Sequence, residues 1–103
     1  MIIYENSVID FLDDLVFKLY KDEYFGFLDS SNDFVAKIVA FIDDNIEVFP
    51  SRKSPFELLY LGSNYIFYKS NQRTTWYIFF ENLDDNYLIT SIINSNSEEV
   101  KWL

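Results

Sequence analysis

Apolar residues recur at helical spacing through the first half of the chain. Residues 1–4 are mostly apolar and predict a short strand. The first helical stripe that follows consists of Val8, Phe11, Leu12, Leu15, Val16 and Leu19. Ser7, with Asp10 three residues later, has the pattern of a helix N-cap, so we expect this helix to begin there. After Gly26 and the polar segment 29–33, a second stripe consists of Val35, Ile38, Ile42 and Ile46. The pattern therefore predicts two antiparallel helices joined by a short connection.

The spacing of apolar residues changes to that of strands after Pro55. Predicted strands cover residues 56–61, 65–69, 74–81 and 87–93, separated by short polar turns. The strand at 74–81 is the strongest, because nearly all its residues are β-branched or aromatic. A short C-terminal helix is expected from about Glu98. The order predicts one α+β domain over residues 1–103, in which an N-terminal strand and a helical hairpin pack on an antiparallel sheet.

Charge divides the chain into unequal parts. The net charge of the 103 residues is −9, which argues against general nucleic-acid binding. Residues 50–80 are the exception, because they hold four basic residues, Arg52, Lys53, Lys69 and Arg73, against one acidic residue, Glu57. A function that handles phosphate or an acidic partner would have to use this segment.

Two absences from the sequence restrict the chemistry. The chain has no cysteine and no histidine, which excludes disulfides, thiolate metal sites, an imidazole base and a Ser–His triad. The adjacent carboxylate pairs, such as Asp13-Asp14, lack the spacing of a metal-binding loop, and there is no glycine-rich phosphate loop. We therefore expect no metal and no cofactor. Without cysteines, a signal peptide or a long apolar run, a cytoplasmic protein with no membrane partner is expected.

The basic turn between the second and third of these strands is the main candidate site. Lys69 and Arg73 flank it, and Arg52 and Lys53 lie on a neighbouring loop. Nearby tyrosines that can stack on bases or donate hydrogen bonds are Tyr65, Tyr68 and Tyr77. Basic and aromatic residues in this mixture are typical of contacts to single-stranded RNA. The alternative is that the four charges are solvated or pair with the acidic helices, since Lys and Arg beside strands often protect sheet edges.

Alternation along the strand at 74–81 refines this prediction. If Trp76, Ile78 and Phe80 point into the core, Tyr77 faces the other way, beside the basic turn.

Three segments, in order along most of the chain, resemble the RelE/ParE-like toxins of bacterial type II toxin–antitoxin systems. They are Tyr24-Phe25-Gly26-Phe27, the stretch Arg73-Thr74-Thr75-Trp76-Tyr77-Ile78-Phe79-Phe80, and residues 87–93 followed by Asn94-Ser95-Asn96. The Thr-Thr-Trp-Tyr sequence is the most specific of these.

The resemblance implies a small β-α-α-β-β-β fold and one of two toxic activities. These activities are endoribonuclease cleavage of ribosome-bound messenger RNA, and inhibition of DNA gyrase by protein contact. Either implies a cognate antitoxin as partner and growth inhibition as the outcome. For the nuclease, Arg73 falls close to the arginine that opens the equivalent strand, Lys69 lies in the turn before it, and Tyr77 is the candidate tyrosine.

The C-terminal region departs from this family pattern. Ser97 stands where related sequences often carry a histidine, and Glu98 and Glu99 occupy the region where RNA-cleaving members place basic groups. Carboxylates there would repel the charge that develops on a phosphate during cleavage. Three interpretations therefore stay open: a ribonuclease toxin, a non-enzymatic binding protein such as a gyrase-inhibiting toxin or a relative that keeps only partner binding, and an interaction domain with no toxic role.

Overall fold

A computed structural model describes residues 1–21 and 28–103 of the chain. The short N-terminal strand β1 (Ile2–Tyr4) is followed by the helices α1 (Asn6–Lys21) and α2 (Leu28–Asn45). The strands after them are β2 (Arg52–Lys53), β3 (Asn64–Lys69), β4 (Thr75–Leu83) and β5 (Asn86–Asn94). Two short 3₁₀ helices, η1 (Phe56–Leu58) and η2 (Glu98–Trp102), complete the described part of the chain.

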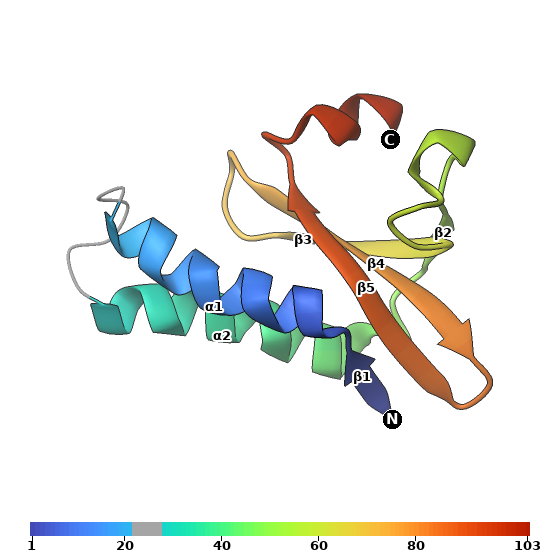
Figure 1. The fold of residues 1–103 in the computed structure, drawn as a ribbon, viewed down its shortest axis with the longest axis horizontal. Coiled ribbons are helices and arrows are strands. Elements are labelled where there is room, and N and C mark those ends of the chain that lie inside the picture. Colours follow the sequence, from blue (N-terminus) through green and yellow to red (C-terminus); the bar gives the residue numbers. More distant parts are fainter. Residues whose placement is uncertain (22–27) are drawn as a thin grey trace.

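The strands form one five-stranded sheet in the order β1-β5-β4-β3-β2 (Figure 1). Neighbours from β2 to β5 pair antiparallel, whereas β1 runs parallel to β5. The predicted α+β class is confirmed, but the sheet is mixed rather than purely antiparallel. Two parallel strands require a long connection in the chain. Here the helical hairpin and strands β2–β4 lie between β1 and β5 in the sequence.

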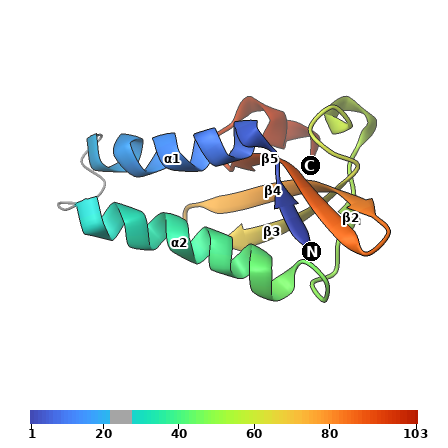
Figure 2. The ribbon, with the colours of Figure 1, turned by 60° about the horizontal axis from the view of Figure 1, so that its bottom comes forward.

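The two helices cover one face of the sheet (Figures 1 and 2). Both predicted stripes point into this core, where Val8, Leu12, Leu15, Val35, Ile38, Ile42 and Ile46 are buried. The sheet contributes Ile66, Trp76, Ile78, Phe80, Ile89 and Ile92. The sequence left open which face of the central strand is buried, and the structure shows that Trp76, Ile78 and Phe80 face this core.

A β-bulge interrupts the pairing of β4 with β5. Phe79 lies opposite Ser91 and Phe80 lies opposite Ile89, so that Thr90 is the extra residue. The bulge explains why Ile89 and Ile92, three residues apart, both reach the helix-covered core. The Thr90 hydroxyl donates a hydrogen bond to the Leu61 carbonyl and so ties the bulge to the segment after η1.

A smaller apolar cluster lies on the opposite face of the sheet. Its buried members are Leu58, Tyr65 and Phe79. The predicted strand at 56–61 is wrong: η1 and a turn replace it, and among residues 56–60 only Leu58 is buried. Pro55 stands in extended conformation just before η1, a position in which proline favours the start of a helical turn.

Helix α1 begins at Asn6, one residue before the expected cap. The Glu5 carbonyl accepts the backbone N–H of Ile9 at 3.1 Å, which places Glu5 rather than Ser7 at the N-cap. The predicted C-terminal helix is present as η2. The predicted break at Gly26 and the Tyr24–Phe27 motif lie outside the described residues.

Candidate functional site

The turn between β3 and β4 is held by its own asparagine. Asn71 Oδ1 accepts the backbone N–H groups of Arg73 at 2.8 Å and Thr74 at 2.9 Å. The Ser70 N–H donates to the Thr74 carbonyl at 3.0 Å and closes the turn. Arg73 is exposed and makes no ion pair with any described residue. The turn therefore holds the backbone of Arg73, whereas its guanidinium has no ion-pair partner among the described residues.

Lys69 and Tyr77 occupy the sheet face opposite the helices. Lys69 lies opposite Thr75, and Tyr77 lies opposite Phe67. Lys69 and Tyr77 are thus diagonal neighbours on one face, within reach of each other's long side chains. Tyr77 is half-buried, and its ring centroid lies 6.2 Å from that of Tyr65. The expected position of Tyr77, close to the basic turn, agrees with this geometry.

Arg52 joins the same face from β2, which sequence reasoning treated as a loop. It lies opposite Tyr65, and its guanidinium stands 5.4 Å from the centre of the Phe67 ring, a cation–π geometry. A pocket of about 270 Å³ here is lined by Arg52, Tyr65, Phe67, Thr75, Tyr77, Val100 and Leu103. Three predicted site residues, Arg52, Tyr65 and Tyr77, therefore meet in one pocket.

Tyr68 and Lys53 are not part of this group. Tyr68 faces the helices, where its ring stacks on Phe41 with centroids 4.9 Å apart and planes at 25°. Lys53 is exposed on β2 opposite Asn64, one position along from Arg52. Adjacent strand residues point to opposite faces, so Arg52 and Lys53 cannot act together on one small ligand.

The acidic 3₁₀ helix η2 borders the pocket. Its Val100, and Leu103 directly after it, line the pocket, and Glu98 and Glu99 form its first turn. Among residues 1–21 and 28–103, no group of three or more Cys, His, Asp or Glu side chains is arranged to hold a metal ion. The pocket thus offers one guanidinium, aromatic rings and tyrosine hydroxyls, which are suited to binding.

Exposed apolar side chains lie beside this pocket, on and next to the two 3₁₀ helices, which contact each other. Phe56 is 83% exposed, Tyr60 is 73% exposed and Trp102 is 47% exposed, with Leu59 and Leu103 also exposed. We call these five residues the 3₁₀ patch. Figure 1 shows η1 and η2 together at one end of the molecule, away from the helical hairpin. Sequence reasoning missed this surface, because it treated residues 56–61 as a strand.

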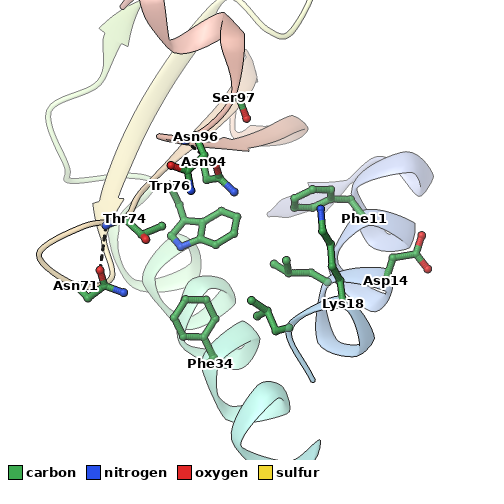
Figure 3. Close-up of a pocket in the computed structure, with 12 residues that line it drawn as sticks. Phe11, Asp14, Lys18, Phe34, Asn71, Thr74, Trp76, Asn94, Asn96 and Ser97 are labelled. Atoms are coloured by element: carbon green, nitrogen blue, oxygen red, sulfur yellow. Dashed lines mark hydrogen bonds between the residues drawn. The ribbon is translucent and has the colours of Figure 1, made fainter. Parts of the chain in front are cut away.

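A larger cavity of about 810 Å³ lies on the helix side, where α1 faces the β3–β4 turn and the end of β5 (Figure 3). Its apolar wall consists of Phe11, Leu15, Leu19, Phe34 and Trp76. Its polar rim consists of Asp14, Lys18, Asn71, Thr74, Asn94, Asn96 and Ser97. We call it the α1–turn cavity. Asn94 and Asn96 attracted attention in the sequence only as part of the family resemblance, and not as lining of a cavity.

No protein-family model, curated protein or solved structure matches this chain. In the part of the chain that the structure describes, no helix has the length and apolarity needed to cross a bilayer.

Proposed function

We propose that this protein is a toxin component of a type II toxin–antitoxin system, or a descendant of one, and that it acts by contact with another protein. The resemblance of residues 73–80 to the RelE/ParE-like toxins motivates the first part. The order of the elements supports it, since β1, α1, α2 and β3–β5 follow one another as that family fold requires, with the two-residue β2 added.

The 3₁₀ patch carries the second part of the proposal. Apolar side chains this exposed are normal when they are scattered singly, but a contiguous group marks an interaction surface. Aromatic residues are also the side chains that contribute most at protein interfaces. Phe56 on η1 and Trp102 on η2 provide them on two elements that contact each other, and Tyr60 adds a third in the turn after η1.

Charge favours protein contact over RNA cleavage. Cleavage needs positive groups around a phosphate that gains negative charge, whereas η2 places Glu98 and Glu99 on the element that borders the pocket. The net charge of −9 also opposes approach to RNA. The partner is expected to be a protein, either the cellular target or the cognate antitoxin.

A ribonuclease remains the second candidate, and one observation favours it. Lys69 and Tyr77 are diagonal neighbours on the face that also holds Arg52, with Arg73 on the adjoining turn. Of these groups, Lys69, Arg73 and Tyr77 are the ones that the family resemblance implies for phosphate contacts.

Expression in a bacterial host separates these functions. We expect the wild-type protein to slow growth without cutting transcripts, and the double variant Phe56→Ser/Tyr60→Ser to lose this effect. Both side chains are exposed, so the melting temperature should change little. Phe17→Ser is the matched control, because Phe17 is 61% exposed on α1, outside the patch.

Two results would overturn contact through the patch. Growth unaffected by the wild-type protein would reject a toxin. Transcript cleavage that disappears in Arg73→Ala, while Phe56→Ser/Tyr60→Ser still slows growth, would establish the ribonuclease instead. A supercoiling assay with purified gyrase tests that target directly, and absence of inhibition at micromolar protein would remove it.

A further inference from the structure

The α1–turn cavity has the dimensions and composition of a small-molecule site. Ligand pockets in proteins measure about 300–1,000 Å³ and combine apolar walls with a few placed polar groups. This cavity measures about 810 Å³ and has both kinds of lining. It lies on the helix-covered side of the sheet and shares no lining residue with the 3₁₀ patch, so a ligand site there does not rest on the proposed function.

Aromatic rings dominate the wall of the cavity. The Trp76 side chain is buried at the base, and the Phe34 ring meets it edge to face, with centroids 6.0 Å apart. Phe11 faces them from α1 (Figure 3). The indole N–H of Trp76 already donates to Ser70 Oγ at 3.2 Å, so only the small part of the indole ring that lines the cavity is left to contact a ligand. Such a wall accommodates a planar ring.

The polar rim is rich in hydrogen-bond donors. Asn71 Oδ1 accepts two backbone N–H groups of its turn, and Asn94 Oδ1 accepts the backbone N–H of Asn96 at 2.8 Å. Because both oxygens are engaged, these two amides have their Nδ2 donors left for a ligand. The rim therefore suits a ligand that carries acceptor atoms.

Lys18 adds a positive charge to these donors. It is exposed on α1, and it makes no ion pair with any described residue, including Asp14 one helical turn earlier. Figure 3 shows Lys18 extending along the cavity wall beside Phe11, whereas the carboxylate of Asp14, which also lines the cavity, is turned to the side of α1 away from Trp76. An ammonium group without an acidic partner among the described residues, together with amide donors, favours an anionic acceptor, since charge-assisted hydrogen bonds are about twice as strong as neutral ones.

We propose that the α1–turn cavity binds a small molecule that combines an aromatic ring with a carboxylate or phosphate group. The ring lies against Trp76 and Phe11, and the anionic group accepts hydrogen bonds from Lys18 and the asparagine amides.

Titration of the ¹⁵N-labelled protein with three probes tests this proposal by nuclear magnetic resonance. The probes are indole-3-acetate, phenyl phosphate and neutral indole. We expect the two anions to shift the indole N–H signal of Trp76 in a saturable manner, and neutral indole to bind at least tenfold more weakly. Trp102, the second tryptophan, lies outside the cavity and is the internal control.

Three variants assign the rim. Lys18→Gln is expected to weaken binding of the anions about tenfold and to leave that of indole unchanged. Asn96→Asp adds a carboxylate to the rim and should weaken binding of the anions by more than Lys18→Gln does. Lys37→Gln removes an exposed cation from α2 outside the cavity. It should change neither the binding of the anions nor that of indole.

The proposal fails if neither anion shifts the Trp76 signal at millimolar concentration, or if both indole signals shift together. It also fails if neutral indole binds as tightly as the anions, or if Lys18→Gln and Lys37→Gln behave alike. All three variants change exposed side chains, and an unchanged pattern of the remaining amide signals verifies that each is folded.

Discussion

At the scale of single residues, Gly62 shows how closely the segment after η1 approaches the sheet. Its φ angle is +155°, a conformation that residues with a side chain rarely adopt. A Cβ atom on Gly62 would lie 2.9 Å from Phe79 Cβ and 3.0 Å from the Phe80 backbone nitrogen. The absence of a side chain at Gly62 therefore lets Leu61 reach the Thr90 hydroxyl at the bulge.

Gly62→Ala is expected to destabilise the protein by about 2–4 kcal/mol, which combines overpacking with an unfavourable backbone conformation. Chemical denaturation measures this as a lower midpoint at an unchanged slope. Gln72→Ala, at an exposed position in the β3–β4 turn, is the control and should stay within about 0.5 kcal/mol of wild type. A loss below about 0.5 kcal/mol in Gly62→Ala would show that the bulge can move aside.

At the scale of elements, the sequence was sufficient to predict a helix or a strand wherever one spacing of apolar residues dominates a long segment. The helical stripes from Val8 to Leu19 and from Val35 to Ile46 predicted which helix faces are buried. For the strand at 74–81 the sequence predicted two alternating faces without deciding between them, and the structure places Trp76, Ile78 and Phe80 in the helix-covered core. Residues 56–61 have no alternation, and there a single buried residue, Leu58, is enough to fix a 3₁₀ turn. Strand β2 has two exposed residues and thus no hydrophobic signal at all.

The candidate site was predictable in part for the same reason. Strand alternation correctly separates Tyr77 from the core. Applied to β3, it would also have placed Tyr65 and Tyr68 on opposite faces, since they are three residues apart. The α1–turn cavity was beyond sequence reasoning, because its lining comes from α1, α2, the β3–β4 turn, β4, the end of β5 and the segment after it. The parallel pairing of β1 with β5 likewise depends on tertiary structure.

The strand β1 is also connected to α2 by a side-chain hydrogen bond. The Tyr4 hydroxyl donates to Asp43 Oδ1 at 3.3 Å. Burial, and then the nearby Asp43 carboxylate, raise the pKa of Tyr4 well above its usual value of 10.0. Because the folded state holds the proton more tightly than the unfolded state, the stabilisation is complete below pH 10 and is lost as the pH rises above that value.

Tyr4→Phe should therefore flatten the decline of the free energy of unfolding above about pH 10, while costing at most about 1 kcal/mol at pH 7. Urea denaturation between pH 8 and the alkaline limit of the protein measures both effects. Tyr60→Phe, at an exposed position, is the matched control and should keep the wild-type slope. Parallel pH curves for Tyr4→Phe and wild type would contradict the assigned coupling.

At the scale of the whole molecule, self-repulsion is the main electrostatic feature. The chain carries 17 acidic and 8 basic residues, and net charge far from zero destabilises a compact state. Helix α2 adds a local cost, since its last turn has no basic residue but includes Asp43 and Asp44. Carboxylates at a helix C-terminus oppose the helix dipole.

Asp44→Lys is expected to raise the free energy of unfolding by about 0.5–1 kcal/mol at low ionic strength, because it reduces both the net charge and the unfavourable dipole interaction. Asp13→Lys on α1 makes the same change of charge away from a helix end, and should gain less. Thermal melts at low salt and in 1 M NaCl measure the difference, which should shrink as salt screens the charges. If both variants raised the free energy of unfolding equally, the change in net charge alone would explain the effect, and the helix dipole would contribute nothing.

The parallel pairing of β1 with β5 has a consequence for how this protein is made. On the ribosome, residues 2–4 and both helices emerge well before residues 86–94, yet β5 lies between β1 and β4 in the sheet. The apolar stripes of α1 and α2 therefore have no complete sheet to cover until residues 86–94 have been synthesised. Such late-closing topologies fold slowly and leave nascent chains exposed to aggregation. We thus expect slow translation of residues 28–86 to prolong dependence on chaperones that bind nascent chains.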